Sequence, residues 1–295
     1  MTIPQPASYC IDLHCHSTAS DGRLSPTDLV ARARLQGVTH LALTDHDTTD
    51  GLAEASVAAA AQGLTLITGI ELSCVWQKNT IHIVGLDMDT ADPVFAARVA
   101  EQQQNRWRRA EAITTRLKKV VRGCPEDIQE RATAEAGGDV PGRPHFARVL
   151  IEDGLVSDFG QAFKKYLGAG KPGDVKAFWP ELAEVVRWVV EAGGIAVVAH
   201  PTKYKLTATK LRALVADFQE AGGQGIEVLT SGQGRGDLGF LSELCRRQGL
   251  LASQGSDFHV PGPDWCELGK IAAMPDDLIP VWQRFRRPVG IAQVA

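Results

Sequence analysis

The chain has 295 residues, of which 44% are hydrophobic and 22% are charged, and its formal net charge is −4. A chain of this length and hydrophobic content buries a large core, so its composition excludes a disordered protein, and 29 Gly and 15 Pro exclude collagen-like sequence. Neither a secretory signal nor a run of about 18 apolar residues occurs, so we expect a cytoplasmic protein that is not held in a membrane. The six cysteines form no Cys-x-x-Cys pair, and we expect them to be reduced.

The charges are unevenly distributed along the chain. Residues 93–179 contain 15 Lys or Arg and 11 Asp or Glu, whereas the rest of the chain contains 16 and 24. The basic middle segment is therefore compatible with a phosphorylated ligand, even though the net charge of the whole chain is negative.

Short apolar runs alternate with helix-like stretches, which predicts an α/β fold built on a parallel sheet or barrel. Before the first of these helices, Ser25 is a predicted N-cap and Pro26 a first helical residue, with the helix ending near Gly37. Further helices are expected at 50–62, 181–192, 208–221 and 238–248. The seven predicted strands are 9–16, 38–44, 64–70, 80–86, 195–200, 225–229 and 250–255.

The segment 88–178 interrupts this alternation. It has helical periodicity at 95–121, 144–152 and 158–166 and no clear strand. We interpret it as an α-helical insertion between the two parts of a barrel domain at 1–87 and 179–295.

Residues 12–16 (Asp-Leu-His-Cys-His) place His14 and His16 on one face of a predicted strand, because alternate strand residues share a face. Such a pair alone is weak evidence for a metal site. More potential ligands follow, however, and most come at or just after the end of a predicted strand, where α/β folds carry their sites. The complete set is His14, His16, Asp21, His46, Glu71, His82, His200, Asp257 and His259.

Six of the eight histidines belong to this set, and only His40 and His145 lie outside it. Nine nitrogen and oxygen ligands are too many for one tetrahedral ion, so the sequence predicts two or three divalent cations. Imidazole and carboxylate without thiolate suit Mn²⁺, our first choice, or Fe²⁺ or Zn²⁺. We expect Cys15 and Cys74 to face the core and His40 to be structural.

These motifs, in this order over about residues 9–260, resemble the PHP (polymerase and histidinol phosphatase) family of metal-dependent phosphoesterases. The resemblance implies a distorted (β/α)7 barrel with three metal ions and the α-helical insertion as a substrate cap. It also implies which residues share an ion: His14, His16, Glu71 and Asp257 at the first, Glu71, His82 and His200 at the second, and Asp21, His46 and His259 at the third.

Other segments resemble the branch of this family that contains a 5′-3′ exoribonuclease and a nucleoside 3′,5′-bisphosphate phosphatase; they include residues 142–148, 163–173 and 252–259. This resemblance implies hydrolysis at the 3′ oxygen of a nucleotide that carries a 5′ phosphate, in short RNA or in nucleoside 3′,5′-bisphosphates. We expect direct catalytic roles for three residues, namely His200, Asp257 and His259.

A 5′ phosphate held away from the metal ions requires cations. The candidates are Arg143, Lys171 and Lys203, with His145 nearby, although Lys203 stands where that branch would have an arginine. Three aromatic residues are candidates for stacking on a base or for helix packing: Trp107, Phe178 and Trp179.

Two alternatives remain open from the sequence. A histidinol-phosphate-type phosphomonoesterase would use the same metals without a pocket for a second phosphate. A catalytically inactive structural module would need no complete ligand set, and all nine positions are intact. We expect no obligate protein partner.

Overall fold

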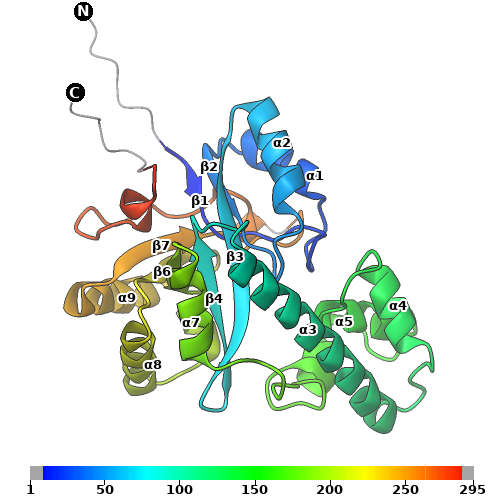
Figure 1. Cartoon of the computed structure of the whole chain (residues 1–295). Helices are drawn as coiled ribbons and strands as arrows, with labels where there is room; N and C mark the ends of the chain where they lie inside the picture. The colour runs from blue at the N-terminus through cyan, green and yellow to red at the C-terminus, as the bar shows by residue number, and fades with distance from the viewer. Residues whose placement is uncertain (1–8, 263, 288–295) are drawn as a thin grey trace, which may run out of the picture.

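The computed structural model describes residues 9–262 and 264–287, so the ends of the expected barrel domain, 1–8 and 288–295, lie outside it. Seven strands follow one another in chain order in one mixed sheet that is nearly closed into a barrel (Figure 1). This confirms the predicted fold class. The strands are β1 (Ile11–Asp12), β2 (His40–Leu43), β3 (Thr65–Trp76), β4 (Asn79–Leu86), β5 (Ile195–Val198), β6 (Gly225–Thr230) and β7 (Leu251–Gly255).

The sheet departs from the predicted βα alternation at β3 and β4. These strands form an antiparallel hairpin, and β4 is also antiparallel to β5, while β1–β3 and β5–β7 are parallel. The strand predicted at 64–70 continues to Trp76, and a two-residue loop, in which Gln77 has a φ of 55°, leads into β4. The prediction of a parallel sheet is therefore wrong for β4 and its two neighbours.

Backbone hydrogen bonds also join the segment that follows β1 to the end of β7 and the segment after it. The Leu13 N–H donates to the Gln254 carbonyl at 3.1 Å, and the His16 N–H donates to the Phe258 carbonyl at 2.9 Å. These bonds bring the segments that follow β1 and β7 side by side. Residues more than 240 positions apart in the sequence therefore share one end of the barrel.

Helices cover the outside of the sheet (Figure 1). As predicted, Ser25 caps the first helix, accepting from the Asp28 N–H at 3.1 Å, and Gly63 ends the second with a φ of 64°. The helices are α1 (Pro26–Leu35), α2 (Leu52–Gln62), α7 (Leu182–Glu191), α8 (Ala208–Glu220) and α9 (Arg235–Gln248), with short 3₁₀ turns η2 (Pro201–Tyr204), η3 (Asp264–Cys266) and η4 (Val281–Arg284).

A group of helices projects to one side of the sheet, with the long helix α3 leading away from it (Figure 1). Ile113, Leu117, Phe146 and Leu150 are fully buried and form part of a hydrophobic cluster separate from those of the barrel. No helix in the described part of the chain is both long and apolar enough to cross a membrane. The group consists of α3 (Pro93–Val120), α4 (Ile128–Glu135), which the sequence analysis did not predict, α5 (Arg143–Glu152), α6 (Phe159–Ala162) and the π-helical turn η1 (Phe163–Leu167).

Candidate metal centre

The nine potential ligands lie together at one end of the barrel. Most follow a strand, as expected, but Glu71 and His82 lie inside the β3–β4 hairpin. The prediction that Glu71 follows the end of a strand is wrong, because β3 continues to Trp76. His82 lies opposite Ser73 on the antiparallel strand, so its side chain reaches the same end from the middle of β4.

Glu71 lies in the middle of the cluster and is fully buried. Its Oε1 is 2.9 Å from both His82 Nδ1 and His200 Nε2, and its Oε2 is 2.9 Å from His46 Nδ1. The two carboxylate oxygens therefore face different imidazoles, which is the geometry of a carboxylate that bridges two cations.

Asp257 closes one side of the cluster. Its Oδ1 is 3.6 Å from His14 Nε2 and 3.4 Å from His16 Nε2, and the same two nitrogens each lie 3.4 Å from Glu71 Oε2. The other oxygen of Asp257 pairs with Lys203 Nζ. Two imidazole nitrogens and two carboxylate oxygens thus converge on one point.

Asp21 closes the opposite side. Its Oδ1 is 3.3 Å from His259 Nε2, and its Oδ2 is 3.9 Å from His46 Nε2. The Asp257 carbonyl accepts from His259 Nδ1 at 2.9 Å, so the other nitrogen of that ring, Nε2, faces Asp21 and is the one that would bind a cation. His46 therefore faces Glu71 with one nitrogen and Asp21 with the other.

The arrangement fits divalent metal ions. Several buried atoms that point into the cluster make no hydrogen bond within the described residues, among them His14 Nε2, both nitrogens of His16, His46 Nδ1 and Glu71 Oε2. Buried polar atoms without partners are costly in a folded protein, and coordination would satisfy them. The side chains form three overlapping groups whose ligand atoms lie within 4.8 Å of one another.

Thiolates do not contribute to this donor set. The Cys15 thiol donates to the Ala42 carbonyl and the Cys74 thiol to the Ile81 carbonyl, and both residues are fully buried within hydrophobic clusters, as we expected. A set of imidazoles and carboxylates is typical of Mn²⁺, Fe²⁺ and Zn²⁺ in hydrolytic sites.

The imidazoles of the cluster stabilise the ionised form of its carboxyl groups. Burial alone would raise the pKa of the Glu71 and Asp257 carboxyl groups, but the surrounding imidazoles, with His46 foremost for Glu71 and His14 foremost for Asp257, hold both pKa values well below their ordinary range. Both groups are therefore ionised carboxylates, which is the form that binds a cation.

Glu227, on β6, was not predicted, yet it positions two of the histidines. It is 1% exposed, its Oε1 accepts from His14 Nδ1 at 2.6 Å, and its Oε2 accepts from the backbone N–H of His200 at 2.5 Å. With the proton held on Nδ1, His14 directs the lone pair of Nε2 into the cluster. The available signal was a single carboxylate within an apolar strand.

Two further aspartates hold the loops that carry ligands. Asp45 accepts from Ser17 and Ser20 hydroxyls, both at 2.6 Å, and so fixes the loop before Asp21. Asp12 accepts from the backbone N–H groups of Ser256 and Gly269 at 2.8 and 2.9 Å. The oxygens of Asp12 thus hold the segment that follows β7.

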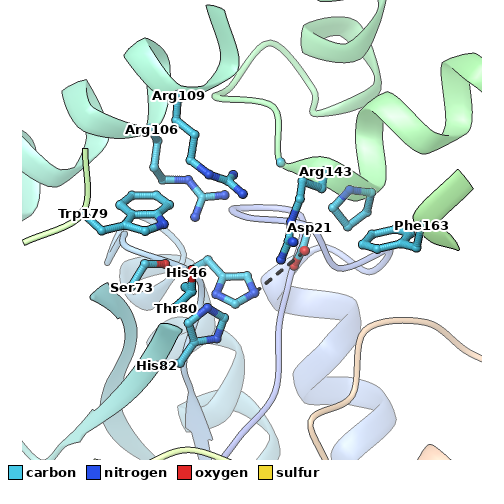
Figure 2. A pocket seen from close by; sticks show the side chains of 12 residues that line it. Asp21, His46, Ser73, Thr80, His82, Arg106, Arg109, Arg143, Phe163 and Trp179 are labelled. Atoms are coloured by element: carbon cyan, nitrogen blue, oxygen red, sulfur yellow. Dashed lines mark ion pairs between the residues drawn. The ribbon is translucent and has the colours of Figure 1, made fainter. Parts of the chain in front are cut away.

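Three guanidinium groups point into a cavity of about 140 Å³ beside the cluster, above His46 and His82 (Figure 2). Arg106 and Arg109 come from α3 and are each only 8% exposed, and Arg143 comes from the start of α5. Burial, together with the charges of Arg143 and Arg106, lowers the pKa of Arg109 well below its ordinary range. Neighbouring buried cations favour an anionic ligand.

Asp47 attaches α3 to the barrel next to His46. This buried carboxylate accepts from Arg106 at 2.8 Å and from Gln102 at 3.0 Å, and its backbone carbonyl accepts from Gln103 at 2.6 Å. Asp47 has a left-handed backbone with a φ of 57°, a conformation that Asp tolerates better than most residues. The contact places the arginines of α3 over the ligand cluster.

Comparison with known proteins agrees with this geometry. A PHP domain model matches residues 12–135. The chain is 46% identical to a 5′-3′ exoribonuclease of Haemophilus influenzae, over 93% of this chain and 98% of that protein. It is 42% identical to a 3′,5′-nucleoside bisphosphate phosphatase of Chromobacterium violaceum, over 92% and 95%. The chain belongs to the PHP family.

A solved structure supports the same conclusion. An amidohydrolase from Chromobacterium violaceum, determined with bound sulfate and no metal, superposes with a TM-score of 0.85 at 42% identity, covering 92% of this chain and 94% of that one. The chain therefore shares its fold with this amidohydrolase over nearly its whole length.

The PHP division of ligands among three ions can be compared with the observed groups. His14, His16 and Glu71 form one group, and Glu71, His46 and His82 a second. The third contains Asp21, His46 and His259 together with His16, and none of the three groups contains His200 or Asp257. His46 thus lies between two groups, whereas the family division gives it to one.

The four predicted substrate-binding residues are in different places. Arg143 lines the arginine cavity, and its NH1 donates to the Leu167 carbonyl at 3.1 Å. His145 is buried, and its Nδ1 accepts from the Gly142 N–H at 2.8 Å, so it shapes the start of the helix that carries Arg143. Lys171 is exposed in a loop, and Lys203 lines a second hollow beyond Asp257.

The three predicted aromatic residues also lie in different parts of the structure. Trp179 lines the arginine cavity and lies under Arg109, whose guanidinium carbon is 5.1 Å from the indole centroid. Phe178 packs against the core of the insertion, and Trp107 lines a hollow of α3 and α4 that contains none of the nine ligands. Of these three aromatic residues, Trp179 is therefore the one that lines this cavity, together with Phe163.

Proposed function

We propose that this PHP protein is a 5′-3′ exoribonuclease on short 5′-phosphorylated RNA and a 3′-phosphatase on nucleoside 3′,5′-bisphosphates. The observation that carries the proposal is the cavity of Arg106, Arg109 and Arg143 beside the ligand cluster. It provides a site for a phosphate other than the one being cleaved. Relatives with these two activities cover nearly the whole chain.

The nine ligand residues would hold two or three divalent cations, for which we propose Mn²⁺, with Fe²⁺ or Zn²⁺ as alternatives. When bound, such ions lower the pKa of water and polarise phosphoryl oxygens. Glu71 would serve as the bridging carboxylate, and Glu227 keeps the proton of His14 on the nitrogen that faces away from the cluster.

The insertion 88–178 would act as a cap that positions the substrate. Arg109 and Arg143 would bind the 5′ phosphate, while Trp179 would form an apolar wall that excludes water. Arg106, already paired with Asp47, would add positive charge without moving. His145 would position Arg143 through the start of α5, and Lys171 would contact the substrate from its exposed loop.

With the 5′ phosphate held there, the phosphorus on the 3′ oxygen would lie over the cluster, near His200, Asp257 and His259, to which we assign direct catalytic roles. Water attacks this phosphorus and the bond to the 3′ oxygen breaks. If the phosphorus bears no other residue, the products are a nucleoside 5′-monophosphate and phosphate. If it continues into RNA, the next residue keeps its 5′ phosphate, and the reaction can repeat.

The proposal is tested by product analysis on a panel of short 5′-phosphorylated RNAs beside adenosine 3′,5′-bisphosphate, with Mn²⁺ present. We expect nucleoside 5′-monophosphates released singly from the 5′ end, and AMP with phosphate from the bisphosphate. Internal cleavage or release from the 3′ end would contradict the proposal. So would faster turnover of histidinol phosphate than of the bisphosphate, since that substrate leaves the arginine cavity without an anion.

A further inference from the structure

A second hollow opens on the other side of the ligand cluster. It is lined by Asp257, His259, Lys203, Val260 and Trp265 and has a volume of about 230 Å³. The arginine cavity, in contrast, adjoins Asp21, His46 and His82. A phosphoester lying across the cluster would therefore have one hollow on each side.

The second hollow continues into a third, of about 210 Å³, because Ser231 and Trp265 line both. The third hollow follows the loop between β6 and α9 and reaches Leu238 at the start of that helix. We call the two together the Trp265 groove. The groove begins beside Asp257 and His259 of the ligand cluster, and Trp265 lies between its two hollows.

The residues of this groove suit a nucleotide. Trp265 is 67% exposed although its indole is large and apolar, and it lies over Gly232, where an added Cβ would come within 3.3 Å of the ring. Lys203 is half-exposed beside Asp257 and supplies a positive charge at the mouth. Ser231 Oγ and Gln233 Nε2 are buried and make no hydrogen bond within the described residues, so both keep an unused hydrogen-bond donor beside the groove.

We propose that the Trp265 groove binds the RNA residue that follows the scissile phosphate, with its base stacked on Trp265 and its backbone near Lys203. This inference rests on the proposed function. The two proposed activities differ only in whether the phosphorus carries a second residue, so the groove is needed for RNA and is left empty by a nucleoside 3′,5′-bisphosphate. Trp265 is thus a specificity-determining residue for the exonuclease reaction.

The test compares Trp265→Ala with wild type on two substrates, adenosine 3′,5′-bisphosphate and the 5′-phosphorylated diadenylate. Because stacking of a base on an aromatic residue has a typical measured effect, we expect kcat/KM on the dinucleotide to fall about 5- to 150-fold. Turnover of the bisphosphate should change less than about twofold. Trp265→Phe should recover most of the dinucleotide activity, because phenylalanine retains a stacking face.

A substrate change gives an independent measurement. For wild type, removal of the second base should lower kcat/KM on the dinucleotide by the same factor. On this substrate Trp265→Ala should lower kcat/KM little further, because both changes remove the same contact. Trp107→Ala is the matched control, because this tryptophan is also partly exposed but lines a hollow without ligand residues. It should behave as wild type on both substrates.

The proposed role of the groove would be wrong if Trp265→Ala lowered kcat/KM equally on both substrates or left kcat/KM on the dinucleotide unchanged. It would also be wrong if the effects of Trp265→Ala and of the missing base were fully additive. Failure of the proposed function is recognised separately, because in that case wild type itself would cleave neither substrate. If wild type cleaves both substrates and Trp265→Ala affects both equally, the proposed function stands and only the proposed role of the groove is wrong.

Discussion

Glu227→Gln is the sharpest test of how the chain positions its metal ligands. The carboxylate accepts from two groups, His14 Nδ1 at 2.6 Å and the His200 backbone N–H at 2.5 Å, and it is 1% exposed. Glutamine has the same shape but only one accepting oxygen. One of the two donors must then face an NH₂ group.

Either orientation of the amide has a consequence. If the NH₂ faces His14, the proton of that ring moves to Nε2, the nitrogen that points into the ligand cluster, and the lone pair needed for a cation is lost. If the NH₂ faces the His200 N–H, two donors oppose each other in a buried site at a cost of about 1–3 kcal/mol. Loss of such a supporting contact typically weakens metal affinity by about 10- to 100-fold.

The assay is a Mn²⁺ titration of activity on adenosine 3′,5′-bisphosphate after metal has been removed with a chelator. For Glu227→Gln we expect the half-saturating Mn²⁺ concentration to rise by about 10- to 100-fold, with most of the maximal rate recovered at saturation. Glu220→Gln, at the exposed end of α8, is the matched control and should titrate as wild type. The same half-saturating concentration in Glu227→Gln and wild type would refute the positioning argument.

Three further substitutions test the arginine cavity, the ligand cluster and the contact between α3 and the barrel. Arg143→Ala should lower kcat/KM on 5′-phosphorylated substrates by about 2–4 kcal/mol of transition-state stabilisation, and a similar loss on a substrate without the 5′ phosphate would count against its role. Asp257→Ala should nearly abolish turnover while the thermal unfolding temperature stays close to that of wild type; retained activity would exclude a catalytic role. Asp47→Asn leaves Arg106 without its buried partner and should lower the free energy of unfolding by about 3 kcal/mol in urea denaturation, and a change below about 1 kcal/mol would show that α3 is held by other contacts.

The sequence predicted the ligand cluster well because its signal is local. Each ligand follows or lies within an apolar run, so placing the runs in one sheet was enough to bring residues such as His14 and Asp257 together. The βα rhythm also predicted the helices around the barrel, and the capping residue Ser25 marked the start of α1.

The β3–β4 hairpin was missed because its turn lacks the usual residues. Two-residue hairpin loops favour Asn-Gly, Asp-Gly or Gly-x, since at least one residue has positive φ. Here Gln77 adopts a φ of 55°, which nothing in its residue type suggests. Without a turn signal, the end of β3 could not be distinguished from a loop.

The arginine cavity depends on tertiary contacts that the sequence does not encode locally. Arg106 and Arg109 lie on an amphipathic helix, where charged residues normally face solvent. Both are held in buried positions by acceptors: Asp47 of the barrel accepts from Arg106, and the Val175 carbonyl, within the group of helices, accepts from Arg109. Lys171, which has the same charge in an exposed loop, was predicted instead.

We propose that the arginine cavity binds the 5′ phosphate of a substrate that is cleaved at its 3′ oxygen over the ligand cluster. The most direct measurement is kcat/KM of the Mn²⁺-loaded protein on matched oligoribonucleotides with a 5′ phosphate or a 5′ hydroxyl, for wild type and Arg143→Ala. We predict a strong preference of wild type for the 5′ phosphate that largely disappears in the variant. Equal kcat/KM of wild type on the two substrates would show that the protein does not recognise the 5′ phosphate.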